Sequence, residues 1–275
     1  MKSFQMKALA LAMLGLGGLV MAGSAFAACP DPTAFSNQGY AAPNGPWSAE
    51  TVSNATIAST TGLAGTTCAM SVSINAAAPS NAKALVMDNS PNNEPRYRAR
   101  FYVDLTNIAS SLVAGDAIRL LNSNANTGPA GISTAEVTAL LIGGSSGAAF
   151  RFQVADPGQA SFFKTITVNA ANPTGVNRIE FDYNTGTSSA CAPGNTVGSF
   201  CVWVSNDTTA ATEASPSASY NLLANSFGTS GNTWSGVKFT NLGMFSSNAG
   251  FRSHAEGKAV TLDEFDSRRQ TFINN

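Results

Sequence analysis

The segment Glu180-Phe181-Asp182-Tyr183-Asn184 places two carboxylates at alternate positions. Alternate side chains of an extended strand share one face. Retaining glycoside hydrolysis uses two carboxyl groups about 5–5.5 Å apart, one as nucleophile and one as acid/base. The positions that could supply a further carboxylate hold Asn184 and Thr185, and an amide cannot donate and recover a proton. We therefore interpret the segment as the polar face of a strand and not as a catalytic set.

Aromatic side chains indicate a different chemistry, because their rings stack on the apolar faces of sugars. The candidates for a sugar-binding surface are Trp47, Trp203, Trp234 and Tyr220. Trp203 is out of phase with Val202 and Val204, so it faces away from the core if the valines face inward. Asn206 follows and could bond hydroxyl groups, as could Asp207. The alternative is that Trp203 covers a sheet edge or a disulfide, because large aromatic residues are mostly buried.

Other catalytic and metal-binding patterns are weak. His254, the only histidine, falls in a polar segment that we expect to be a solvated loop, and no G-x-S-x-G elbow accompanies it. We predict no metal site, because zinc spacing is missing and the acids that could bind calcium are isolated. These acids are Asp88, Asp116, Asp207 and Asp263.

Paired arginines at 98/100 and 268/269 could bind an acidic ligand. We expect them instead to lie on strand faces and to pair with nearby carboxylates such as Asp104 or Asp266, since Arg forms bidentate contacts with carboxylates.

Short strands must position these groups, because hydrophobic residues recur with a period of two. The expected strands are 68–74, 84–88, 97–104, 117–122, 136–142, 150–154, 164–168, 179–183, 200–205, 237–244 and 259–265. Turn-rich stretches separate them, residues 28–55 read as irregular, and 206–219 is the longest interruption. No helical period is sustained, which favours an all-β antiparallel sandwich or jelly roll.

The first 27 residues have the three parts of a secretory signal peptide: two lysines, an apolar run at 8–21 and the A-x-A site Ala25-Phe26-Ala27. The apolar run is shorter than the roughly 20 residues of a spanning helix. A lipoprotein site at Cys29 is disfavoured because an aliphatic residue is expected where Phe26 stands. We predict cleavage after Ala27 and a mature chain, residues 28–275, that forms a single domain in the periplasm or outside the cell.

The mature chain would have 275 − 27 = 248 residues, with 15 − 2 = 13 Lys+Arg against 16 Asp+Glu, a formal charge of −3. Because there is no basic block, nucleic acid is not an expected partner. No other apolar run could span a membrane. The oligomeric state stays open.

All four cysteines lie in the exported part, where an even count predicts two disulfides. Three pairings are possible. We favour Cys29–Cys68, which would tie down the mature N-terminus, and Cys191–Cys201, which brackets a turn-rich loop.

Several strings resemble concanavalin A-like lectin/glucanase (LamG-like jelly-roll) domains of secreted bacterial proteins. They are Glu94–Val103, Gly115-Asp116, Arg178–Phe181 and Leu262–Arg269. The resemblance implies two large antiparallel sheets packed face to face, with the first and last strands close together. Calcium is common in that family, and its family-16-type glucanases use E-x-D-x-x-E, which is incomplete here. The fold hosts lectins, hydrolases and adhesion modules, so no activity follows from it.

The sequence therefore predicts an exported, non-catalytic domain that binds a polysaccharide, a cell-surface glycan or another extracellular ligand. We expect Trp203, Trp234, Asn206 and Tyr220 to bind it. The alternatives are a glycan hydrolase or lyase with an unrecognised active site, and an adhesion module that binds protein.

Overall fold

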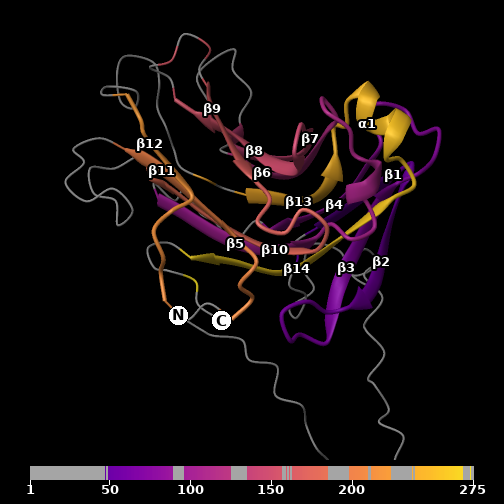
Figure 1. The fold of residues 1–275 in the computed structure, drawn as a ribbon, viewed down its shortest axis with the longest axis horizontal. Helices are drawn as coiled ribbons and strands as arrows, with labels where there is room; N and C mark the ends of the chain where they lie inside the picture. The colour runs from indigo at the N-terminus through magenta and orange to yellow at the C-terminus, as the bar shows by residue number, and fades with distance from the viewer. Residues whose placement is uncertain are drawn as a thin grey trace, which may run out of the picture.

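A computed structural model describes residues 47, 49–88, 96–124, 135–156, 159, 161, 163–184, 198–209, 212–223, 237, 239–268 and 273. Fourteen strands make up most of this part (Figure 1). They are β1 (Ala49–Ser53), β2 (Ala55–Thr61), β3 (Cys68–Ile74), β4 (Lys83–Asp88), β5 (Arg96–Asp104), β6 (Ala117–Asn124), β7 (Ala135–Gly144), β8 (Gly147–Ala155), β9 (Phe163–Asn169), β10 (Val176–Asn184), β11 (Ser199–Ser205), β12 (Ala218–Asn221), β13 (Phe239–Phe245) and β14 (Ala259–Arg268).

The strands form two antiparallel sheets of seven, which lie as two layers in Figure 1. The first sheet has the order β1-β4-β13-β6-β7-β8-β9, and the second has the order β12-β11-β10-β5-β14-β3-β2. The last described strand, β14, pairs with β3 and β5, whereas the first, β1, lies at the edge of the other sheet. The predicted two-sheet antiparallel jelly-roll sandwich is confirmed.

The core lies between the sheets and follows from the alternation of the strands. On β5, Phe101 and Val103 point into it, and on β10 Ile179 and Phe181 do the same. Phe181 stacks on Phe200 of β11, with ring centroids 6.1 Å apart. Burying each such side chain contributes roughly 1.5–3 kcal/mol. The opposite faces of β5 and β10 are then left to polar residues.

A bulge in β14 changes which side chains face outward. The register between β14 and β5 shifts between Asp263 and Asp266, and Glu264 has a φ of 50°. A left-handed backbone is unfavourable for a residue with a Cβ. Bulges of this kind redirect a side chain, and here the carboxylate of Glu264 reaches Arg100.

Residues Ala249–His254 form a short helix, α1, where the sequence predicted a loop. The side chain of Asn248 caps it by accepting a hydrogen bond from the N–H of Phe251 at 2.8 Å, which satisfies a donor at the helix start. At its end, Nδ1 of His254 lies 3.0 Å from Oδ1 of the buried Asp116. The lone histidine is thus held by a carboxylate and is not simply solvated.

Three of the strands were not predicted from the sequence. Strand β1 falls inside the stretch 28–55 that we expected to be irregular, and β12 uses the end of the stretch 206–219. Strand β2 was missed altogether. All three are strands rich in Ala, Ser and Thr, and they lie at or next to the sheet edges, so their alternation of apolar and polar residues is weak.

Cys68 on β3 and Cys201 on β11 are both disulfide-bonded. Cys29 and Cys191 lie outside the described residues, so the pairing stays a prediction, as do the signal peptide and the single-domain boundary. In the part of the chain that the structure describes, no helix has the length and apolar character needed to cross a bilayer.

Candidate functional site

The outer face of the second sheet carries a row of charged side chains. Alternation on β5 places Arg96, Arg98 and Arg100 on this face, and β10 contributes Glu180 and Asp182. Glu180 is opposite Arg100 in the register and Asp182 is opposite Arg98. Cross-strand neighbours of opposite charge can pair directly or diagonally, and both strands lie in the middle of the sheet.

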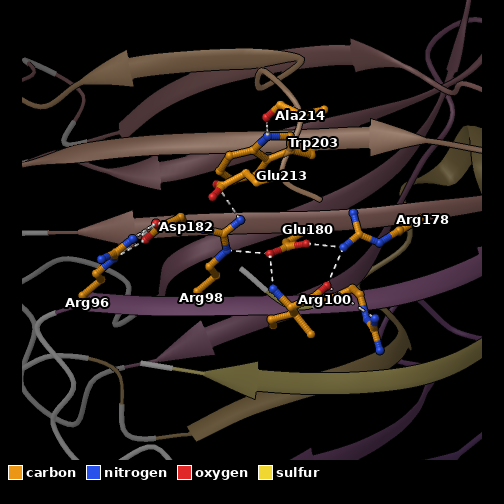
Figure 2. A network of polar contacts seen from close by, with 10 residues as sticks. Arg96, Arg98, Arg100, Arg178, Glu180, Asp182, Trp203, Glu213 and Ala214 are labelled. Atoms are coloured by element: carbon orange, nitrogen blue, oxygen red, sulfur yellow. Dashed lines mark hydrogen bonds and ion pairs between the residues drawn. The ribbon is translucent and has the colours of Figure 1, made fainter. Parts of the chain in front are cut away.

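The shortest ion pairs between these strands are diagonal (Figure 2), and the directly opposite Arg98 and Asp182 lie 3.8 Å apart. Arg96 Nε lies 3.0 Å from Asp182 Oδ1, and Arg98 Nε lies 2.5 Å from Glu180 Oε1. Arg98 Nη2 also contacts Glu213, which belongs to the segment after β11, at 2.9 Å. The hydrogen bond to Asp182 is the main cause that raises the pKa of Arg96, so this guanidinium stays charged.

Two further ion pairs extend the row. Arg178 Nη2 lies 2.5 Å from Glu180 Oε2, and Arg100 Nη2 lies 2.8 Å from Glu264 Oε2. These contacts join four arginines to four carboxylates, so the charges of the network balance. We call these eight residues the charged network. Its members are Arg96, Arg98, Arg100, Arg178, Glu180, Asp182, Glu213 and Glu264.

Most of the charged network is inaccessible to solvent. The side chains of Arg98, Glu180 and Asp182 are fully buried. Charges removed from water are tolerated only when they are paired and hydrogen-bonded, which explains why each carboxylate here meets a guanidinium. Glu180 and Asp182 are therefore held by arginines and do not face solvent, which argues against a glycosidase role for this pair.

Trp203 packs against Arg98, in the middle of the charged network. It lies on β11 opposite Glu180, on the outer face, as its phase relative to the valines predicted. The guanidinium of Arg98 lies 4.5 Å from its ring centroid, and its Nε1–H donates to the carbonyl of Ala214 at 2.8 Å (Figure 2). Trp203 is only 5% exposed, so the expectation that large aromatics are buried also holds.

A cavity of about 390 Å³ opens beside Trp203, between the end of β11 and the segment 207–217. Trp203, Arg178 and Asp207 line it, together with hydroxyl side chains. The hydroxyl residues are Ser205, Thr209, Thr212, Ser215 and Ser217. We call this the Trp203 cavity. Its volume falls in the range of about 300–1,000 Å³ that is typical of small-molecule sites.

Opposite charges meet in the wall of the Trp203 cavity. Hydrogen bonds from the backbone N–H and the hydroxyl of Thr209 lower the pKa of Asp207, and the positive charge of Arg178 lowers it further. Asp207 is thus an exposed, ionised carboxylate. Arg178 is nearly buried and is held by Glu180. The cavity therefore offers a fixed cation, an anion, several hydroxyls and an indole.

The backbone of Ile273 lies against the charged network. Its N–H donates to Glu180 Oε1 at 3.1 Å. Its carbonyl accepts hydrogen bonds from Arg178 Nη2 at 2.6 Å and from Arg100 Nη1 at 3.5 Å. Ile273 has no exposed surface. No pattern in the sequence predicted this contact, because it depends on tertiary structure and not on the spacing of residues.

The other predicted ligand-binding residues do not meet at the Trp203 cavity. Asn206 is exposed beyond β11 and does not line the cavity. The hydroxyl of Tyr220, on β12, donates to Asp156 Oδ2 at 2.6 Å and accepts from Gln159. Trp47 packs against Phe265 with centroids 5.2 Å apart. Trp234 lies outside the described residues.

The arginine pair on β5 binds carboxylates as predicted, but the ion pairs of Arg98 and Arg100 are with residues other than Asp104. Arg98 pairs with Glu180 and Glu213, whereas Asp104 accepts hydrogen bonds from Thr106. Sequence proximity suggested Asp104, whereas the strand register selected Glu180, which is 82 positions from Arg98. The side chains of the second arginine pair lie outside the described part.

The four acids considered for calcium lie apart and have other partners. Asp263 accepts from the N–H of Leu63 at 2.6 Å and from the hydroxyl of Thr66. Asp116 accepts from the N–H of Val113 at 2.9 Å. Over the described ranges, no three His, Cys, Asp or Glu residues come close enough to hold a metal ion.

The contact of Tyr220 with Asp156 predicts an alkaline ionisation. Burial, followed by the hydrogen bond to Asp156, raises the pKa of Tyr220 to about 12. Because the folded value lies above the unfolded value of about 10, this contribution to stability is complete below pH 10 and is lost as the pH rises towards 12. In a phenolate absorbance titration, Tyr220→Phe should lack a step near pH 12 that the wild type shows. A step missing near pH 10 would contradict the assignment.

Comparison with known proteins supports the fold. No protein-family model and no curated protein matches the sequence. An endo-β-1,4-glucuronan lyase from the fungus Trichoderma reesei superposes with a TM-score of 0.55 at 12% identity, covering 84% of this chain and 94% of the lyase. An alginate lyase from Pseudomonas aeruginosa gives 0.47 at 10% identity, covering 74% of this chain and 83% of the other. At 12% identity, the likeness to the glucuronan lyase shows the shared fold alone, in agreement with the two antiparallel sheets described above.

Proposed function

We propose that the protein is an exported, non-catalytic domain that binds a carbohydrate in the Trp203 cavity. The observation that carries this proposal is the composition of the cavity wall, which combines an indole, five hydroxyls, a held guanidinium and an ionised carboxylate. A saccharide has the matching groups: apolar C–H faces for the indole and hydroxyls that both donate and accept hydrogen bonds.

The held position of Arg178 favours binding with little reorganisation. Its guanidinium is fixed by Glu180 at 2.5 Å and by the carbonyl of Ile273 at 2.6 Å. A side chain that is already ordered loses little conformational entropy when a ligand arrives. Trp203 is held in the same way by Arg98 and Ala214.

The non-catalytic part of the proposal rests on the state of the two carboxylates on β10. Glu180 and Asp182 are both buried and ion-paired with arginines. A general acid must reach the proton that it transfers, and neither group is placed to do so. The Trichoderma reesei lyase is carbohydrate-active on the same fold, but fold alone does not transfer an activity.

Export is the second part of the proposal and is supported by the basic, apolar and A-x-A segments of residues 1–27. Disulfide bonding of Cys68 and Cys201 fits an oxidising compartment.

The test of binding combines a glycan array with fluorescence titration of the protein that starts at residue 28. We expect at least one saccharide class to bind and to change tryptophan emission. Ser215→Phe, which places a ring in the cavity, should weaken that binding at least about 10-fold, which is roughly 1.4 kcal/mol. Ser219→Phe on β12 is the matched control, because Ser219 is exposed and does not line the cavity. Binding that both variants retain, or no binding at all, would refute the proposal.

A polysaccharide panel tests the absence of catalysis. We expect no turnover of the bound saccharide. Turnover that disappears in Asp182→Asn, with the fold retained by circular dichroism, would replace the binding proposal with an enzymatic one.

A further inference from the structure

We propose that the outer face of the first sheet carries a second binding site, in which Arg119 and Arg151 bind the anionic groups of an acidic saccharide. Trp203 and its cavity lie on the outer face of the second sheet, and the outer faces of the two layers point away from each other (Figure 1). The second site is therefore separate from the Trp203 cavity, goes beyond the proposed function and can be tested apart from it.

The strand register places the two arginines in one row. Arg119 on β6 is opposite Leu140 on β7, and Leu140 is opposite Arg151 on β8. Opposite residues of antiparallel strands share a face, and this face is the outer one because Phe150 and Phe152, on either side of Arg151, belong to the core. Adjacent strands lie about 4.8 Å apart, so the backbones at the two arginines are about 10 Å apart, with Leu140 between them.

Arg119 is withdrawn from water without a counter-ion. The side chain is half-buried, its guanidinium lies 5.7 Å from the ring centroid of Phe245, and its Nε is buried without a hydrogen-bond partner. Burial lowers the pKa of Arg119, and no carboxylate of the described residues raises it again. A desolvated charge is costly unless an opposite charge compensates it, so an anion is the missing partner of this group.

The second sheet shows how the same chain treats an arginine that serves the fold. Each of the four arginines in the charged network contacts a carboxylate of the chain. Among the described residues, no such ion pair includes Arg119 or Arg151. A guanidinium binds a carboxylate or a sulfate through two parallel hydrogen bonds. Two unpaired guanidinium groups in one row therefore match a ligand that carries more than one such anion.

The next row of the same face indicates what else the ligand carries. Asn122 is opposite Asn241 on one side and Thr138 on the other, and Thr138 is opposite Gln153. The hydroxyl of Thr138 donates to Asn122 Oδ1 at 2.9 Å. These side chains are uncharged, and they both donate and accept hydrogen bonds, as sugar hydroxyls do. A row of cations beside a row of amides and a hydroxyl favours an acidic saccharide over an acidic peptide.

Three saccharides test the site by calorimetric titration of the purified protein at low ionic strength. They are an oligouronate, the same oligouronate with its carboxyl groups reduced to alcohols, and a sulfated oligosaccharide. We expect an anionic saccharide to bind and the reduced one not to bind. Binding of the oligouronate identifies a uronate as the source of the anion, and binding of the sulfated oligosaccharide alone identifies a sulfate ester.

Arg119→Met keeps the length of the side chain and removes the guanidinium. It should weaken binding of the anionic saccharide at least about 10-fold, as expected for the loss of a hydrogen bond between charged groups. Lys258→Gln is the matched control, because it removes one positive charge from an exposed residue that precedes β14 of the other sheet, and it should bind like the wild type.

Urea denaturation separates binding from folding. Arg119→Met should be at least as stable as the wild type without ligand, because it removes a desolvated charge that has no counter-ion. Arg151→Gln is the second test. It changes the other cation of the row, leaves Arg119 and its contact with Phe245 in place, and should also weaken binding.

Several outcomes would overturn the site. These are no binding of either anionic saccharide, equal binding of the reduced oligouronate, and undiminished binding by both Arg119→Met and Arg151→Gln. Polyglutamate that binds as tightly and loses affinity in Arg119→Met would show that the ligand is an acidic peptide. Ser215→Phe should leave binding of the anionic saccharide unchanged. If it abolishes that binding, the anion enters the Trp203 cavity, so the second site is wrong and the proposed function stands.

Discussion

Glu180→Gln should lower the free energy of unfolding by about 3–5 kcal/mol, the cost of breaking a buried ion pair by removing one partner. Glu180 is fully buried and contacts Arg98 and Arg178 through its two oxygens and the N–H of Ile273 through one of them. Glutamine has nearly the same shape but no charge, so two guanidinium groups lose their shared counter-ion. Urea denaturation of both proteins, followed by circular dichroism, measures the difference.

Glu213→Gln is the control for this prediction. Glu213 contacts the same Arg98 at 2.9 Å, but its side chain is 33% exposed. Water can hydrate this partly exposed side chain when its charge is removed. We therefore expect the free energy of unfolding to fall by about 1 kcal/mol or less. Equal losses in the two variants would show that burial does not govern the energetics of the network.

Trp203→Ala should also cost about 3–5 kcal/mol, the usual range for removing a large buried aromatic side chain. The loss would have two sources. The ring covers the guanidinium of Arg98, and its Nε1–H holds Ala214 in the segment that forms the other wall of the cavity. Hydrogen exchange should therefore increase in residues 207–217 more than in the strands of the opposite sheet.

Trp203→Phe separates the two sources. Phenylalanine keeps an aromatic face for Arg98 and loses the hydrogen bond to Ala214, which alone is worth about 1 kcal/mol. We expect this variant to lie much closer to the wild type than to Trp203→Ala. If the two variants were equally unstable, the hydrogen bond and not the ring would control this part of the fold.

The sheets could be predicted well because apolar and polar residues alternate along each strand according to which side chains are buried. Phe181 and Asp182 differ by one position, and one enters the core while the other joins the charged network. The same phase argument placed Trp203 on the outer face. It could not show that the segment with Glu213 and Ala214 would fold back over the ring, because loop paths depend on tertiary contacts.

The sequence could not predict which carboxylate each arginine contacts. Arg98 meets Glu180 because β5 and β10 are neighbours with one particular register, and a shift of one residue would turn every charge into the core. Helix α1 was missed for a different reason. Its six residues are too few to show a helical period, and its stability comes from the cap at Asn248 and the contact of His254 with Asp116.

The position of β14 has a consequence for how the chain assembles. Although β14 is the last strand in sequence, it lies inside the second sheet, between β5 and β3. A polypeptide that emerges from its N-terminus during synthesis therefore lacks a central strand of that sheet until residues 259–268 appear. The second sheet cannot close before then, because no strand lies between β3 and β5 to pair with both of them. We therefore expect the second sheet to close only after β14 is available to pair with β3 and β5.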